Sequence, residues 1–173
     1  VGINRDVTEE KQARDRTLWE AAAEQLLADS IHALLESTTP TQLVDTLSVR
    51  LCEFLKCDWY CNFVFDEANQ QLVLNANGGM PPDAQAKLAR LNLRGSVCGR
   101  AARKRRMVHA TDIQRGNDLE TALLKECGFQ SYCVFPLLAG GKVLGTIGFG
   151  AFNRSRFADD ELKFIERFSQ ELA

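Results

Sequence analysis

Residues 130–152 read QSYCVFPLLAGGKVLGTIGFGAF. Two apolar runs flank Ala139-Gly140-Gly141, and paired glycines between such runs are typical of a tight β-hairpin. Residues 58–67 and 71–76 form a second pair of alternating strands, which ends at Asn77-Gly78-Gly79. Neighbouring strands joined by short turns pair antiparallel. This half of the chain therefore predicts a mainly antiparallel sheet.

Helical patterns surround these strands, and local signals set their ends. Thr39 and Ser96 are predicted N-caps, and Gly128 is predicted to close a helix in the left-handed conformation. The predicted helices cover residues 6–37, 40–55, 81–91, 96–106, 118–126 and 159–172, and a brief strand covers 107–110. Strand pairs covered by helices make an α+β fold rather than a doubly wound nucleotide-binding sheet.

Composition favours one globular domain. The chain has 173 residues, 45% of them hydrophobic, and a formal net charge of -2. No apolar run reaches the roughly 18 residues that a membrane helix needs. The balanced charge gives no reason to expect nucleic acid or an anionic membrane as a partner. Because the chain begins at Val1 without a signal segment, we expect a cytoplasmic piece of a longer protein.

The first predicted helix is unusually long, because glycine and proline are missing between residues 3 and 39. Asp6 is its predicted N-cap, with Glu9 as the capping-box partner. Leu27, Ile31 and Leu34 form an apolar stripe. The stripe predicts either a homodimer through helix pairing or packing on the domain's own sheet.

Six cysteines, at 52, 57, 61, 98, 127 and 133, have no C-x-x-C spacing, and only two histidines accompany them. This pattern predicts no metal site. Most of the cysteines are expected to be small buried hydrophobes in a reducing compartment, with redox use as the alternative.

The candidate ligand pocket lies where one face of residues 58–67 meets the following helices. Its predicted lining residues share apolar or sulfur-containing side chains, with one histidine: Trp59, Cys61, Phe63, Cys98, Ala101, His109 and Cys133. An apolar hollow of this kind suits a small organic ligand, and a packed core is the alternative. As a lone histidine, His109 also fits a hydrogen-bonded structural role better than that of a haem ligand or general base.

Catalytic motifs are missing. Gly140-Gly141-Lys142 lacks the remaining residues of a phosphate-binding loop, and neither G-x-S-x-G nor H-E-x-x-H occurs. We therefore expect no enzyme activity and no required cofactor in this chain. The basic run from Arg100 to Arg106 is read as a solvated helix face, or alternatively as a site for an anion or an acidic partner helix.

Several segments together resemble a GAF domain: Gly95-Ser96-Val97-Cys98-Gly99-Arg100-Ala101, Val108 to Ile113, Gly128 to Leu137, Val143 to Phe149, and the F-x-x-x-E-L of Phe157 to Leu162. The resemblance covers roughly residues 25–173. Gly2 to Glu9 resembles the end of a PAS domain. Together these resemblances imply a PAS remnant at 1–8, a signalling helix at 9–37 and a sensory domain at 38–173, on which the helix packs from about residue 25.

The resemblance implies a bacterial signalling protein of the sensor histidine kinase type. The implied ligand pocket lies between the sheet and the helices at 81–106 and 118–127, and the implied dimer forms through the N- and C-terminal helices. No cysteine precedes a histidine as in bilin-binding relatives, and no cyclic-nucleotide signature is present. Haem and zinc sites are not evident either.

Two alternatives stay open. Free methionine-R-sulfoxide reductases resemble this chain in the G-V-C-G segment, where Cys98 matches, and Cys127 lies near their catalytic cysteine. A thiol enzyme would use one cysteine to attack and another to resolve. The other alternative is a regulatory module of a diguanylate cyclase or phosphodiesterase.

Overall fold

A computed structural model of the chain describes residues 3–36 and 40–171, with side chains for 8–32, 46–82 and 84–171. The chain divides into two compact units, Val1–Thr38 and Thr39–Ala173. The first unit holds one long helix, α1 (Ile3–Glu36). Within it, Arg16 pairs with Glu20 at 3.1 Å, one turn apart on the exposed surface, a spacing that stabilises helices modestly.

The second unit is built on one six-stranded antiparallel sheet with strand order β3-β2-β1-β6-β5-β4. Its strands are β1 (Trp59–Asp66), β2 (Gln71–Gly78), β3 (Arg90–Asn92), β4 (Val108–Ala110), β5 (Ser131–Ala139) and β6 (Lys142–Ala151). Its helices are α2 (Pro40–Phe54), α3 (Pro82–Leu88), α4 (Val97–Lys104), the 3-10 turn η1 (Leu119–Thr121), α5 (Ala122–Glu126) and α6 (Asp159–Glu171). The α+β fold predicted from sequence is confirmed.

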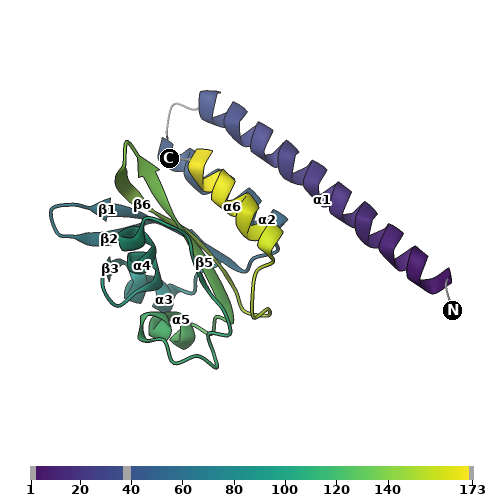
Figure 1. The fold of residues 1–173 in the computed structure, drawn as a ribbon. Helices are drawn as coiled ribbons and strands as arrows, with labels where there is room; N and C mark the ends of the chain where they lie inside the picture. Colours follow the sequence, from purple (N-terminus) through teal and green to yellow (C-terminus); the bar gives the residue numbers. More distant parts are fainter. Residues whose placement is uncertain (1–2, 37–39, 172–173) are drawn as a thin grey trace. The chain divides into compact units, whose positions relative to one another are not determined.

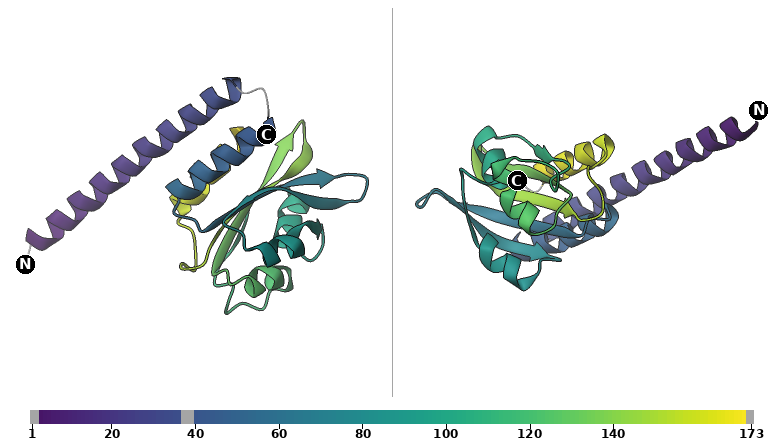
Figure 2. Two further views of the ribbon diagram at one scale, coloured as in Figure 1. Left: turned by 180° about the vertical axis from the view of Figure 1, so that it is seen from behind. Right: turned by 90° about the horizontal axis from the view of Figure 1, so that it is seen from below.

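Helices cover both faces of the sheet (Figure 1). α2 and α6 lie along one face, and α3, α4 and α5 lie on the other, as the views from behind and below also show (Figure 2). The central strands are consequently buried on both sides: residues 59–63 of β1 and 131–135 of β5 are all buried.

Glycines on β6 make room for aromatic side chains on the α3–α5 face. A Cβ at Gly148 would stand 1.9 Å from the Tyr132 hydroxyl, and one at Gly150 would stand 2.4 Å from the Phe129 ring. Such distances are far inside van der Waals contact, so any side chain at either position must displace the ring. Glycine at positions 148 and 150 of β6 therefore leaves the space that the Tyr132 and Phe129 rings occupy on this face of the sheet.

Local signals act as expected at several ends. Ser96 Oγ accepts the Gly99 N–H at 3.0 Å and caps α4. Gly128 has φ 87 and follows the end of α5. Two predictions are wrong. The first helix begins at Ile3, so Asp6 lies inside it and is not its cap. The helix expected over 81–91 ends at Leu88, and β3 (Arg90–Asn92) takes the place of its last residues.

The signalling-helix residues are placed only in part. Glu9 and Ile31 lie on α1 with exposed side chains, and Leu27 lies on the same helix. The side chains of Asp6 and Leu34 lie outside the described residues. Over residues 3–36 and 40–171, every helix is too short or too polar to cross a membrane.

Candidate functional site

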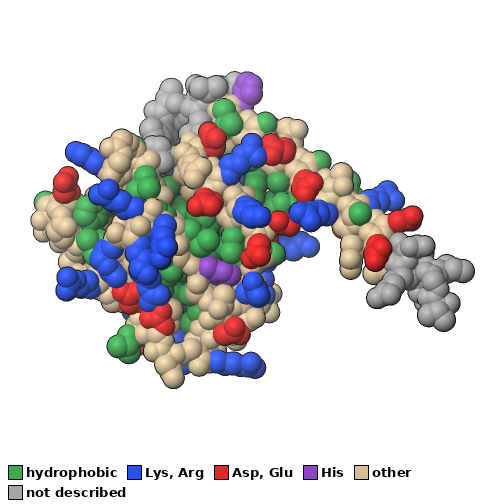
Figure 3. All heavy atoms as spheres, viewed as in Figure 1, with side chains coloured by type: hydrophobic (Ala, Val, Ile, Leu, Met, Phe, Trp, Pro, Cys, Tyr) green, Lys and Arg blue, Asp and Glu red, His purple; other side chains and the backbone are tan. Residues whose placement is uncertain are grey.

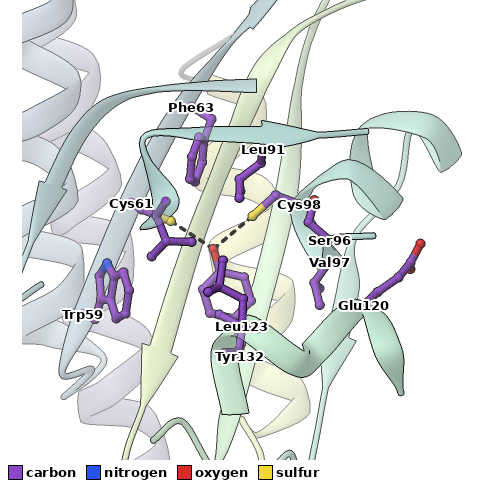
Figure 4. A pocket seen from close by; sticks show the side chains of 12 residues that line it. Trp59, Cys61, Phe63, Leu91, Ser96, Val97, Cys98, Glu120, Leu123 and Tyr132 are labelled. Atoms are coloured by element: carbon purple, nitrogen blue, oxygen red, sulfur yellow. Dashed lines mark hydrogen bonds between the residues drawn. The ribbon is translucent and has the colours of Figure 1, made fainter. Parts of the chain in front are cut away.

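A small enclosed cavity lies between the sheet and the α3–α5 layer (Figure 4). Its free volume is about 20 Å³, enough for about one water molecule. Most of its lining is apolar or sulfur-containing; the residues are Trp59, Cys61, Phe63, Leu88, Leu91, Ser96, Val97, Cys98, Glu120, Leu123, Leu124 and Tyr132. The site is therefore a nearly closed apolar hollow with a few polar groups.

Two thiols share one phenol at the centre of this cavity. The Tyr132 hydroxyl lies 3.0 Å from Cys61 Sγ and 3.3 Å from Cys98 Sγ, and all three residues are buried (Figure 4). β1, α4 and β5 each supply one of them. The phenol is thus within hydrogen-bonding distance of both thiols.

The pKa values of the two thiols shift in opposite directions although both side chains are buried. Burial raises the pKa of the Cys61 thiol well above its ordinary value, and also raises the pKa of Tyr132. Hydrogen bonding from Cys61, with a further contribution from Tyr132, lowers the pKa of Cys98 against the opposing effect of burial. Cys98 also lies in the first turn of α4, where the helix dipole favours negative charge. The hydrogen bonds and the helix dipole thus both favour the thiolate of Cys98.

Trp59 supplies an unsatisfied donor. Its side chain is 1% exposed and lines the cavity, yet its indole Nε1 finds no hydrogen-bond partner within the described part of the chain. Buried polar atoms are paired in the great majority of cases, and an orphan carries an energetic cost. A residue that lines the cavity therefore carries a buried donor without a partner.

Ion pairs connect η1, which contributes Glu120 to the cavity lining, to α4. Glu120, which lines the cavity, accepts hydrogen bonds from Arg100 and from Arg103, the latter at 2.8 Å. Arg100 also pairs with Asp118, which caps η1. These four residues, hereafter the latch, join η1 to α4.

The latch shifts the titration of its carboxylates. The hydrogen bond from Arg100 lowers the pKa of Asp118. Partial burial raises the pKa of Glu120, but hydrogen bonds from Arg103 and Arg100 outweigh it, so the pKa is lowered overall. Both carboxylates are thus held ionised against their guanidinium partners.

The structure brings together four of the seven predicted pocket residues. Trp59, Cys61, Phe63 and Cys98 line the cavity, and Ala101 is buried in the same core cluster without lining it.

The other two predicted pocket residues are elsewhere. His109 Nε2 accepts the Phe157 N–H at 3.2 Å, and its ring meets the Phe157 ring edge-on at 5.8 Å. Cys133 pairs with His109 across β4 and β5 and points away from the side that Tyr132 faces. The prediction that His109 and Cys133 line the pocket is therefore wrong, and His109 has the hydrogen-bonded role expected of a lone histidine.

Sequence reasoning missed three lining residues that matter: Tyr132, Glu120 and Leu123. For Tyr132 a signal existed, because it alternates with Cys133 on a predicted strand. Cys127, the second cysteine of the thiol-enzyme alternative, is half-buried and does not line the cavity. The thiol that the structure places beside Cys98 is Cys61.

The basic run of α4 is divided between two environments. Arg100 is half-buried in the latch, whereas Arg103, Lys104, Arg105 and Arg106 are exposed, although Arg103 also pairs with Glu120 in the latch. Figure 3 shows Lys and Arg side chains gathered on this face of the molecule. The reading as a solvated face thus fits the exposed residues, and Arg100 is an exception to it.

Several solved structures of bacterial proteins share this architecture. The GAF domain of an Acinetobacter phosphoenolpyruvate-protein phosphotransferase aligns with a TM-score of 0.73 at 16% identity, over 87% of this chain and 90% of that one. The corresponding GAF domain from Coxiella burnetii gives 0.74 at 20% identity, over 87% and 89%. Free methionine-R-sulfoxide reductase from Neisseria meningitidis, solved with its substrate, gives 0.75 at 18% identity, over 88% and 86%.

At these identities the likeness shows the fold, which sensory domains and an enzyme share. A search of the curated proteins found no match. Comparison with protein families matches residues 37–173 to the GAF domain, which is most of the chain and all of the sheet and its covering helices. The chain therefore belongs to the GAF domain family.

Proposed function

We propose that this domain senses a small molecule, mainly apolar and carrying one hydrogen-bond acceptor, in the cavity of Trp59, Cys61, Cys98 and Tyr132. The observation that carries the proposal is the buried, unpartnered Trp59 Nε1 in an apolar lining. Ligand pockets typically combine apolar walls with a few polar groups that fix orientation. An acceptor on the ligand would remove the cost of the orphaned donor.

Binding requires the cavity to grow, because about 20 Å³ admits no organic molecule. The latch marks the wall that moves: η1 and α5 are short, and Leu119 at their start is 86% exposed. Ion pairs across a partly exposed wall are individually weak. We expect a bound ligand to displace η1 and α5 from α4. The fraction of molecules in this open state depends on how much more tightly the ligand binds it than the closed state.

The test uses the fluorescence of Trp59. The chain has two tryptophans, so Trp19→Phe in α1 leaves Trp59 as the sole reporter. The probes are acetophenone and ethylbenzene, which are similar in shape and differ in the carbonyl acceptor. We expect saturable changes in Trp59 emission with acetophenone and much weaker binding of ethylbenzene.

Matched variants locate the site. Leu123→Phe enlarges a side chain that lines the cavity, whereas Leu119→Phe makes the same kind of change at an exposed neighbour. Binding should weaken in the first variant and stay unchanged in the second. Equal binding of both probes, or equal effects of both variants, would remove the basis of the proposal.

We further propose that the domain belongs to a cytoplasmic bacterial signalling protein of the sensor histidine kinase type, with a PAS domain upstream. A cyclase or phosphodiesterase is the alternative effector. Support comes from the resemblance of Gly2 to Glu9 to a PAS end and from six cysteines that form no disulfide with one another, which suit a reducing compartment. The expected partner is a second copy, joined through α1 and α6.

Exposed apolar residues on α1 support that pairing: Leu18 is 61% exposed and Ile31 is 41% exposed. Sedimentation of the chain, with and without residues 1–20, tests it. We expect a dimer at tens of micromolar that the deletion weakens; a monomer unaffected by the deletion contradicts the pairing.

A second candidate function is reduction of free methionine-R-sulfoxide. The lowered pKa of Cys98 within the cavity favours it, as does the fold of the Neisseria enzyme. The purified chain with a thioredoxin system tests for turnover, and Cys98→Ser and Cys127→Ser test the assignment. We expect no turnover, because Cys127 does not reach the cavity; turnover that either variant abolishes would replace the sensory proposal.

A further inference from the structure

The end of α2 carries two cysteines that the ligand cavity does not use. The Cys57 N–H donates to the Cys52 carbonyl at 2.9 Å, and the Cys52 thiol donates to the Cys57 carbonyl at 3.2 Å. Lys56 between them is left-handed, with φ 51, and turns the chain back over the helix end. A disulfide needs Cα atoms about 4.4–6.8 Å apart, and a direct backbone hydrogen bond brings the two residues to that order of separation.

A fixed cation lies against this pair. Arg154 Nη2 is 3.8 Å from Cys57 Sγ and donates to the Leu55 carbonyl at 3.0 Å. Arg154 Nη1 is held in turn by both carboxylate oxygens of Glu161. A nearby arginine favours the thiolate, which is the reactive form, so Arg154 assists Cys57 rather than Cys52.

The pair is also more accessible than the thiols of the core. Cys52 and Cys57 are both partly exposed, whereas Cys61, Cys98 and Cys133 are buried. Hydrogen bonding from Cys57 lowers the pKa of Cys52, while the same interaction and burial raise the pKa of Cys57. This asymmetry suits one attacking and one resolving thiol.

We propose that Cys52 and Cys57 form an oxidation site that hydrogen peroxide converts into a disulfide. The Cys52 thiolate attacks one peroxide oxygen, the O–O bond breaks, and hydroxide leaves, which takes up a proton to become water. The Cys57 thiol then attacks the Cys52 sulfenic acid, the S–O bond breaks, and a second water leaves. Peroxide is reduced, and two thiols are oxidised to one disulfide.

The disulfide would link the last turn of α2 to Cys57, which follows that helix. Cys57 Sγ contacts Arg154, and Arg154 binds Glu161 in the first turn of α6. The oxidised pair would therefore be connected to α6 through this arginine. The site is separate from the ligand cavity on the other face of the sheet, so its failure would leave the sensory proposal untouched.

The test is peptide mapping of the full chain, reduced and then treated with equimolar hydrogen peroxide. We expect a Cys52–Cys57 disulfide, seen as the loss of two hydrogen atoms from the peptide that contains both residues. Cys57→Ser should lose the disulfide and leave a Cys52 sulfenic acid that dimedone traps. Cys52→Ser should lose both products.

A control variant keeps the assignment specific. Cys127→Ser removes a partly exposed thiol at the end of α5, on the other face of the sheet, and should leave the Cys52–Cys57 product unchanged. A disulfide between Cys61 and Cys98 in place of this one, or overoxidation of Cys52 without a disulfide, overturns the proposal. Dimedone trapping at Cys57 in the Cys52→Ser variant would reverse the roles and contradict the assignment of Cys52 as the attacking thiol.

Discussion

Replacing Glu161 with alanine should uncouple α2 from α6. Glu161 Oε1 and Oε2 accept from Arg154 Nη1 at 2.7 and 2.9 Å, and Oε2 also accepts the Ala158 N–H at 2.7 Å at the start of α6. Arg154 reaches the Leu55 carbonyl at the other end of the network. A single carboxylate therefore caps one helix and orients the arginine that binds the end of another.

The expected loss follows from these contacts. A hydrogen bond to a charged group contributes about 1.5–3 kcal/mol, and a helix cap contributes about 0.5–2 kcal/mol. The side chains of Arg154 and Glu161 are 27% and 15% exposed, so solvent screens the pair only in part. Because the contributions overlap, we expect Glu161→Ala to lower the free energy of unfolding by about 3 kcal/mol, and Glu161→Gln, which keeps an acceptor, by less.

Urea denaturation measures this change. With a slope of about 2 kcal/mol per molar urea, the midpoint should fall by roughly 1.5 M. Asp159→Ala is the matched control, since its carboxylate is 80% exposed and meets Arg156 only at 3.8 Å; its effect should stay within about 0.5 kcal/mol. Equal midpoints for the two variants would refute the reasoning that Glu161 joins the helices.

Two further perturbations test other parts of the fold. Burial lowers the pKa of His109, so the unfolded chain binds the proton more readily. The free energy of unfolding should therefore fall as the pH drops below the unfolded pKa of about 6.5. His109→Gln should flatten this pH dependence between pH 7 and 5 in urea denaturation, and an unchanged slope would contradict the role given to His109. Gly148→Ala places a Cβ 1.9 Å from the Tyr132 hydroxyl and should cost about 1–3 kcal/mol through overpacking; a wild-type midpoint would show that Tyr132 is not confined as described.

Most of the fold could be predicted because its signals are local. The glycine pair at 140–141 sets one hairpin, and Ser96 alone specifies the start of α4 through its bond to Gly99. β3 has no such signal. It is three residues long and exists through its pairing with β2, where Gln71 lies opposite Asn92, so nothing in residues 90–92 by themselves indicates a strand.

Alternation of side chains along a strand predicts which residues share a face of the sheet, but the site follows only where it is also known which face lines the cavity. Trp59, Cys61 and Phe63 alternate on β1 and do share the cavity. On β5 the same rule separates Tyr132 from Cys133 but cannot say which one faces the cavity, because both faces of the strand are buried. The cysteine was the natural choice for a sulfur-lined pocket, and the tyrosine turned out to occupy that side.

Arg154 shows why the remaining polar network is invisible to a local reading. Its partners are Leu55 and Cys57, which lie 99 and 97 residues earlier in the sequence, and Glu161, which lies 7 residues later. An arginine after a strand normally suggests solvent exposure, and only the assembled fold brings these acceptors to one guanidinium. Its Nε is nonetheless buried and unpaired within the described residues. Removing the partners of a partly buried cation is destabilising because the charge is left uncompensated. We therefore expect the α2–α6 face, and the thiol pair beside it, to respond to changes at this one residue.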